Sequence, residues 1–249
     1  MRVDLTQDAF LGGRVRIWQP ERGYRAGVDP VLLAAACPAE AGETVLELGC
    51  GVGTASLCLA ARVQGAGLTC IEIQSDMAAL ARRNAVENAV DLGVHDGDLT
   101  KPPPNIRDRN FDHVIANPPY FRREAGSAAA DGTRETALGE VTPLADWLDA
   151  ARRRLKPKGW LTLIHRPERL TDLCAGLSGF GDIRLLPIAP RDGREASLVV
   201  IRARKGARGP LRLLAPFIMH DGAEHVLDGD DYTAMAKSVL RDAAALPGF

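Results

Sequence analysis

Short apolar runs alternate with amphipathic stretches through most of the chain. The runs have the length of buried strands, and the stretches between them repeat at helical spacing. Strands are expected at 44–48, 68–73, 111–116 and 160–165, with a short one near Val94. Helices are expected at 54–63, 75–89, 144–155 and 167–177. Strands that alternate with helices predict an α/β fold with a Rossmann-like, doubly wound and mostly parallel sheet.

Further elements are expected toward the two ends of the chain. The runs at 183–187 and 197–204 have no clear helix between them, which predicts an antiparallel hairpin at the sheet edge. Residues 13–19 alternate between apolar and polar side chains, as an edge strand does. The tail suggests a strand at 211–214 and a helix at 231–244.

These elements predict one domain, 1–249, built in three parts. An N-terminal extension would cover 1–43, a catalytic core 44–205, and a C-terminal strand and helix 206–249. Weak periodicity between 122 and 142 predicts a loop over the carboxyl end of the sheet.

Two polar residues fit helix starts. Asp29 followed by Pro30 is typical of a helix cap and first turn, here for a helix over 31–37. Ser75 is a similar candidate at the start of the helix over 75–89.

The composition excludes several classes of protein. The chain has 249 residues, of which 46% are hydrophobic, and no apolar run approaches the ~18 residues that cross a membrane. The first ten residues lack the core of a signal peptide, so we expect a cytoplasmic protein. The five Cys follow no ligand or disulfide spacing and are expected to be small buried hydrophobes. No spacing of His, Cys, Asp or Glu indicates a metal site.

Charge is distributed unevenly along the chain. Residues 152–212 hold 15 Lys and Arg but five Asp and Glu, a local charge of +10. Because the whole chain has a net charge of −1, the remainder carries −11. Such asymmetry favours an anionic partner for the basic part, although scattered solvated side chains would give the same count.

A glycine-rich turn follows the first core strand. Gly49, Gly51 and Gly53 allow a tight turn and close approach of the backbone to a ligand. Glu47 precedes the turn, where a carboxylate suits a cationic amine and repels a phosphate. Glu72 ends the next strand, at the spacing of an acid that binds both ribose hydroxyls. An adenosine with an amino-acid tail fits this set, which points to S-adenosylmethionine.

The tetrad Asn117-Pro118-Pro119-Tyr120 follows the strand at 111–116. Proline stiffens the corner and contributes no N–H, so the corner is rich in hydrogen-bond acceptors. The Asn117 side-chain oxygen and the Pro118 carbonyl can accept both hydrogens of one planar amino group. Tyr120 offers a flat face to a planar substrate. The tetrad therefore favours chemistry on an amide or base amino nitrogen.

With both motifs, the chain resembles class I S-adenosylmethionine-dependent methyltransferases that methylate amino nitrogens, whose catalytic motif is Asn-Pro-Pro-Tyr. Within this group it is most similar to bacterial adenine methyltransferases that modify valine tRNA. That similarity rests on segments 10–13, 19–20, 23–29 and 32–34, on Arg134-Glu135, and on 231–233. The resemblance implies S-adenosylmethionine as cofactor, tRNA as substrate, and the class I methyltransferase fold.

The resemblance also assigns residues to roles. Catalysis falls to Asn117, Pro118 and Tyr120. The cofactor set is Glu47 with Gly49, Gly51 and Gly53 at the methionine part, Glu72 at the ribose, Asp98 and Leu99 at the adenine, Arg25 near the carboxylate, and Asn117. The substrate set is Phe121, Arg122, Arg134 and Arg194.

Three other functions stay open from the sequence. The tetrad also serves protein glutamine methylation, although a +10 segment suits RNA better than a peptide loop. A nicotinamide-binding oxidoreductase would need a longer glycine turn for its pyrophosphate and leaves residues 117–120 without a role. An inert cofactor-binding subunit would have no use for an intact tetrad.

Overall fold

The computed structural model describes residues 4–23, 25–120, 142–222, 224 and 231–249. The strands are β1 Leu5–Phe10, β2 Val15–Pro20, β3 Thr44–Leu48, β4 Gly67–Glu72, β5 Leu92–Asp96, β6 Phe111–Ala116, β7 Leu155–His165, β8 Phe180–Ala189, β9 Leu198–Lys205, β10 Arg212–Leu213 and β11 Phe217–Ile218. The helices are α1 Asp29–Ala36, α2 Thr54–Arg62, α3 Ser75–Glu87, α4 Pro104–Arg107, α6 Leu144–Arg154, α7 Leu170–Gly176 and α8 Ala234–Asp242, with 3-10 turns at Leu11–Gly13 and Pro167–Arg169.

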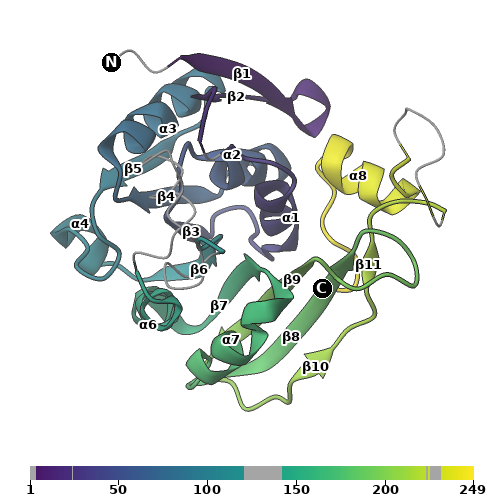
Figure 1. Ribbon diagram of the computed structural model, residues 1–249. Coiled ribbons are helices and arrows are strands. Elements are labelled where there is room, and N and C mark those ends of the chain that lie inside the picture. Colours follow the sequence, from purple (N-terminus) through teal and green to yellow (C-terminus); the bar gives the residue numbers. More distant parts are fainter. Residues whose placement is uncertain (1–3, 24, 121–141, 223, 225–230) are drawn as a thin grey trace.

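A central sheet organises the molecule (Figure 1). Among the described residues it has nine strands, in the order β10-β8-β9-β7-β6-β3-β4-β5, with β11 also paired to β8. All neighbours pair in parallel except at β9, which is antiparallel to both β7 and β8. The expected doubly wound sheet with an antiparallel edge hairpin is confirmed.

Apolar side chains bury both faces of this sheet. One core cluster joins it to α1, α2 and α8, and a second joins it to α4, α6 and α7. Figure 1 shows these helices on opposite sides of the strands. The strands β3 and β6 are buried through almost their whole length, as in a parallel sheet covered twice.

The N-terminal strand expected at 13–19 lies outside the central sheet. Residues 15–20 form β2, which among the described residues pairs with β1 in a separate two-stranded antiparallel sheet. This hairpin is fastened to α3 by two asparagines. Asn84 accepts from Trp18 N (2.8 Å) and donates to Trp18 O (3.0 Å), and Asn88 makes the same pair of bonds to Arg16. The hairpin therefore lies beside the sheet rather than extending it.

Several local expectations were wrong. The N-cap of α1 is Val28, and Asp29 lies inside the first turn of that helix. The N-cap of α3 is Gln74 rather than Ser75. The segment 167–177 is a 3-10 turn followed by α7 rather than one helix. Four cysteines are buried as expected, but Cys174 is exposed.

No helix among the described residues combines the length and apolar character that crossing a bilayer requires.

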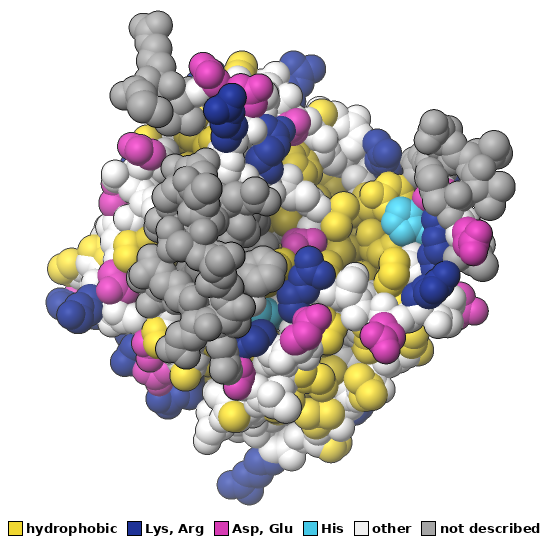
Figure 2. Space-filling view, in the orientation of Figure 1, with side chains coloured by type: hydrophobic (Ala, Val, Ile, Leu, Met, Phe, Trp, Pro, Cys, Tyr) yellow, Lys and Arg dark blue, Asp and Glu magenta, His cyan; other side chains and the backbone are white. Residues whose placement is uncertain are grey.

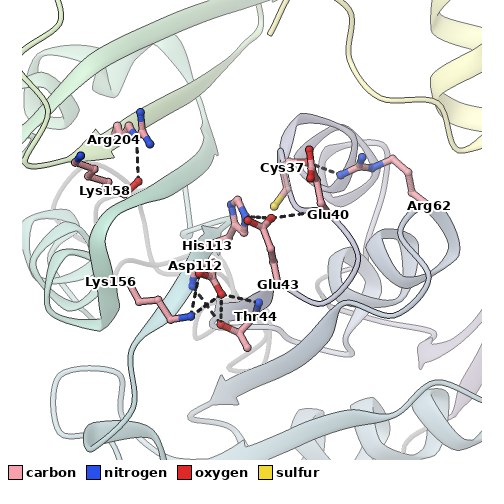
Figure 3. Close-up of polar contacts among 10 residues, drawn as sticks. All are labelled: Cys37, Glu40, Glu43, Thr44, Arg62, Asp112, His113, Lys156, Lys158 and Arg204. Carbon is pink, nitrogen blue, oxygen red and sulfur yellow. Dashed lines mark hydrogen bonds and ion pairs between the residues drawn. The ribbon is translucent and has the colours of Figure 1, made fainter.

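Polar contacts close the amino end of the sheet (Figure 3). Asp112 of β6 accepts from Thr44 N (2.9 Å), Thr44 Oγ1 (2.7 Å) and Lys156 Nζ (2.8 Å). Beside it, Glu43 lies 2.8 Å from the Nε2 atom of the buried His113. Thr44, Asp112 and Lys156 stand near the starts of β3, β6 and β7, so these bonds tie three strands together where they begin.

Candidate active site at the carboxyl end of the sheet

A cavity of about 320 Å³ opens at the carboxyl ends of the parallel strands. The strand order changes direction between β3 and β6, and ligands of open α/β sheets bind at this switch point. Leu48 of β3 pairs with Ala116 of β6, so the glycine turn and the tetrad leave the sheet side by side. The lining includes Glu47, Gly49, Gly51, Glu72, Gln74, Met77, Asp98, Leu99, Asn117, Pro118, Pro119, Tyr120 and Trp147.

The glycine turn is shaped by close packing and by an open ligand side. Gly49 has φ +63°, and a Cβ atom there would lie 2.4 Å from the Trp147 ring. Gly51 also has a positive φ, but a Cβ atom there would meet nothing within 4 Å. The two glycines therefore serve different needs: Gly49 admits Trp147, while Gly51 leaves its backbone exposed to the cavity.

Glu47 is a buried carboxylate joined to the start of α2. Its Oε2 atom accepts from Ser56 N at 3.0 Å and from the Ser56 hydroxyl. Ser56 is the third residue of α2, so Glu47 satisfies one of the N–H groups that a helix leaves unpaired. Burial raises the pKa of Glu47 to about 7, although the Ser56 bonds lower it. A cationic group entering the cavity would favour the ionised form.

Glu72 fastens the opposite side of the turn. Its two oxygens accept from Gly51 N (2.8 Å) and Gln74 N (2.9 Å). Burial raises the pKa of this carboxyl, and the backbone hydrogen bonds oppose that rise. Each carboxylate oxygen can accept more than one hydrogen bond, so Glu72 can hold a pair of adjacent hydroxyls while keeping the turn in place.

Asp98 and Leu99 form the wall beyond β5. Asp98 Oδ1 accepts from Thr100 N and Thr100 Oγ1, each at 2.8 Å, which is a tight side-chain turn. Leu99 is 9% exposed and contributes an apolar surface. Together with Met77 and Ile73 they make a site for a flat ring edged by one acceptor.

Asn117 and Tyr120 belong to the lining of this cavity. The Tyr120 hydroxyl lies 3.0 Å from Asn117 Oδ1 and 2.5 Å from Asp29 Oδ2. Asp29 lies in the first turn of α1, so this contact spans 91 residues of sequence. The tetrad is thus anchored by a helix outside the core strands.

The Tyr120 ring is bounded by two residues from the end of β7. The buried His165 meets it edge to face, with ring centroids 5.1 Å apart. The Arg166 guanidinium lies 5.3 Å from the Tyr120 ring centroid. A planar substrate at this ring would therefore lie close to a cation.

Not every residue assigned from the sequence lies at the cavity. Arg25 instead donates to Thr6 Oγ1 (2.6 Å) and pairs with Asp8, on the N-terminal hairpin, and is absent from the lining. Arg194 is exposed in the turn between β8 and β9, also outside the lining. Phe121, Arg122 and Arg134 lie outside the described residues.

Three contributors escaped the sequence analysis of the site: Asp29, Trp147 and Arg166. The sequence did indicate that Asp29 stands at the start of a helix. No local pattern indicated its hydrogen bond with Tyr120. Among the described residues, no group of three His, Cys, Asp or Glu side chains could hold a metal ion.

Space-filling views show the surroundings of the site. On the face of Figure 2, hydrophobic side chains gather in a hollow near the centre, and both basic and acidic side chains stand at its border. A flat or apolar group could enter such a hollow.

Comparisons with known proteins agree with this geometry. Residues 27–171, more than half of the chain, match the family model of the methyltransferase small domain. A tRNA1(Val) (adenine(37)-N6)-methyltransferase of Porphyromonas gingivalis W83 is 34% identical over 175 residues, 67% of this chain and 68% of the relative. The enzyme of that name from Shewanella halifaxensis is 34% identical, covering 64% of each chain.

Solved structures give the same fold. A predicted O-methyltransferase from Agrobacterium tumefaciens has a TM-score of 0.70 at 29% identity, covering 87% of this chain and 97% of that chain. The Thermus thermophilus 16S rRNA N2 G1207 methyltransferase has a TM-score of 0.55 at 19% identity, covering 82% and 51%. The matched family segment contains both the glycine turn and the tetrad, and the chain therefore belongs to the methyltransferase small-domain family.

Proposed function

We propose that this methyltransferase uses S-adenosylmethionine to methylate an exocyclic amino nitrogen, and that its substrate is adenine in tRNA. The observation that carries the proposal is the placement of Asn117 beside the glycine turn, in one cavity with Glu47 and Glu72. The tetrad suits an amino nitrogen, and the neighbouring residues suit an adenosine. The two groups line one cavity, as methyl transfer between two bound molecules requires.

The cavity residues fit the cofactor part by part. Glu72 offers carboxylate oxygens to the ribose hydroxyls, and Asp98 with Leu99 suits the adenine edge. The exposed backbone at Gly51 and the buried Glu47 suit the amino-acid end. When bound, the cofactor supplies an electrophilic methyl group on a sulfonium. The protein's task is to hold both reactants in line.

The tetrad acts on the nucleophile. The lone pair of a base amino nitrogen is delocalised into the ring, so the nitrogen attacks poorly. Asn117 Oδ1 and the Pro118 carbonyl accept its two hydrogens, favour a pyramidal nitrogen and stabilise the positive charge that develops there. Tyr120 presents its ring to the base, which must leave its stack to reach the site. No covalent enzyme intermediate is needed.

Two observations favour tRNA over other substrates. Relatives of about one-third identity are named as adenine methyltransferases of tRNA1(Val). The segment 152–212 carries +10, and exposed arginines such as Arg194 suit a phosphate backbone. A glutamine side chain in a protein is the second candidate, because an amide nitrogen presents the same two hydrogens to the tetrad.

Mass spectrometry of bulk tRNA nucleosides tests the proposal in cells. A strain that lacks the gene should lose one N6-methyladenosine signal, and the wild-type gene should restore it. A gene encoding Asn117→Ala should fail to restore it at equal protein level. An unchanged nucleoside profile, together with loss of methylglutamine from a protein, would instead support the second candidate.

A further inference from the structure

Three arginines stand side by side on one face of the central sheet, outside the cavity lining. Arg202 of β9 stands opposite Arg184 of β8, and Arg184 is also paired with Arg212 of β10. Like charges that face each other across neighbouring strands repel, so this row is unfavourable by itself. Asp182 offsets part of the repulsion, because its carboxylate lies 3.2 Å from Arg184 Nη2 and 2.6 Å from Arg212 Nη2.

Arg202 is buried and has no counter-charge of its own. The residue is 6% exposed, and within the described part of the chain its guanidinium makes no hydrogen bond and no ion pair. The Nε atom is fully buried, whereas the terminal nitrogens keep some contact with solvent. Burial, together with the charge of Arg184, lowers the pKa of Arg202 to about 10, so the side chain is still a cation at pH 7. A buried cation without a partner is unfavourable, which indicates a place for an anion.

Two aromatic rings hold the arginine side chains in place. The Arg202 guanidinium carbon lies 4.8 Å from the Phe249 ring centroid and 5.1 Å from that of Trp160. Arg184 and Arg204 approach the same Trp160 ring at 5.5 and 5.3 Å. Contact with a ring face stabilises a guanidinium group but uses none of its N–H donors. The donors at the edges of these stacked groups can therefore still bind a ligand.

Arg204 extends the row from the end of β9. Its Nε atom donates to the Lys158 carbonyl at 2.9 Å, which anchors the side chain beside the turn before Trp160 (Figure 3). In the same view, the Glu43 carboxylate lies against His113 Nε2, at 2.8 Å. The arginine cluster thus consists of Arg184, Arg202, Arg204 and Arg212, and together with Asp182 it carries a net charge of +3.

We propose that the arginine cluster is a phosphate-binding site, separate from the methyltransferase cavity. Phosphate oxygens match the planar donor fork of arginine, and several forks can share one phosphate group. A net charge of +3 also exceeds what a single carboxylate would neutralise. Both an RNA backbone and the free ion carry this group.

The cluster lies too far from Tyr120 to share a small ligand with the cavity. Trp160 and His165, whose ring contacts Tyr120, are five residues apart on β7, which is about 17 Å along an extended strand. An RNA with its base at the tetrad, as in the proposed function, would reach the cluster only as a chain of several nucleotides. A free phosphate ion would occupy the cluster alone.

Calorimetry with inorganic phosphate tests the site without RNA. The purified protein would be titrated at constant ionic strength, with chloride as the balancing anion. Arg202→Met keeps most of the side-chain volume but removes the charge, and should weaken phosphate binding at least tenfold. Arg184→Gln changes a more exposed side chain and should also weaken it, so this variant carries the test if Arg202→Met does not fold. Arg83→Met removes an exposed arginine that lies over Trp18, outside the cluster, and should bind as wild type does.

A tRNA titration distinguishes the two sources of phosphate. If the ligand is an RNA backbone, the two cluster variants should weaken tRNA binding and lower the salt slope by about 0.7–0.9 for each lost contact. If the ligand is the free ion, their tRNA affinity should equal that of wild type while the calorimetric loss remains. Folded cluster variants that match wild type and Arg83→Met in both titrations would overturn the proposal. Neither titration depends on methyl transfer, so failure of the proposed function would leave this test intact.

Discussion

At the two ends of the central sheet, one carboxyl group has a raised pKa and another has a lowered pKa. At the carboxyl end, burial raises the pKa of Glu47 to about 7. At the amino end, Asp112 is only partly buried, and hydrogen bonds from Lys156 and Thr44 lower its pKa to about 2. The same kind of group thus costs stability where a ligand is to bind and adds stability where three strands begin. Function and stability are divided between the two ends of one sheet.

The clearest way to break the functional end is at Asn117. Asn117→Ala should lower turnover by about 10²–10³, the usual loss for one preorganised contact to a transition state. Cofactor affinity by calorimetry should stay within a small factor, and NAD should not bind. Asn105→Ala removes an exposed asparagine away from the cavity and serves as control. Near-normal turnover by Asn117→Ala would mean that Asn117 only shapes the turn and has no catalytic role.

The glycine turn is also held from outside, by a buried amide. Asn84 is 0% exposed, and besides its two bonds to Trp18 it donates to Val52 O at 3.0 Å. Asn84→Ala leaves buried backbone groups without partners and should lower the free energy of unfolding by about 2–4 kcal/mol. Asn88→Ala breaks the matching exposed bridge to Arg16 and should cost less than about 1 kcal/mol in the same urea titration. Equal losses would mean that burial does not set the difference.

Ionised Glu47 should lower the free energy of unfolding and strengthen the binding of the cofactor. Its pKa is raised on folding, so the stability present at pH 4.5 is lost as pH rises through about 7. Glu47→Gln should therefore raise the free energy of unfolding at pH 8 by about 1–3 kcal/mol and do little at pH 4.5.

In the same variant, S-adenosylmethionine should bind about ten- to a hundredfold more weakly, because a charge-assisted bond is lost. Wild-type affinity should rise between pH 6 and pH 7.5 as Glu47 ionises, and the variant should show a flat profile. A variant that is no more stable than wild type at pH 8 would contradict the claim that Glu47 costs stability. A variant that binds the cofactor as wild type does would contradict its role in binding.

Asp112 should respond to pH in the other direction. Its pKa falls on folding, so its contribution is complete above about pH 4 and is lost as pH falls toward 2. Asp112→Asn should lower the free energy of unfolding at pH 7 by about 1 kcal/mol, given the partial exposure of the pair with Lys156. Turnover per folded molecule should not change. Asp108→Asn, in an exposed pair with Arg107, should alter neither quantity measurably.

Sequence patterns were sufficient where local chemistry decides the structure. The strands at 44–48 and 111–116 have the expected bounds, and Glu47, Glu72 and Asn117 line one cavity as expected. Apolar runs and turn glycines carry that information within a few residues of the site. The roles of these residues stay predictions.

Contacts between distant segments could not be predicted in this way. The strand β1 contains Thr6, Gln7 and Asp8 and has no fully buried position, so its pattern is weak. Without β1 the sequence offered no partner for Arg25, which pairs with Asp8 and lies outside the cavity lining. The Asp29–Tyr120 contact likewise depends on how α1 packs against the sheet, which no local motif encodes.

The most direct test of the account is methyl transfer by the purified protein. S-adenosylmethionine with a labelled methyl group would be incubated with unmodified tRNA, and the digested nucleosides would be analysed by mass spectrometry. We predict label in N6-methyladenosine with wild type and a loss of about 10²–10³ in rate with Asn117→Ala. Label on a ribose or other oxygen, or no label in tRNA from protein that binds the cofactor, would contradict the claim that this site methylates an adenine amino nitrogen.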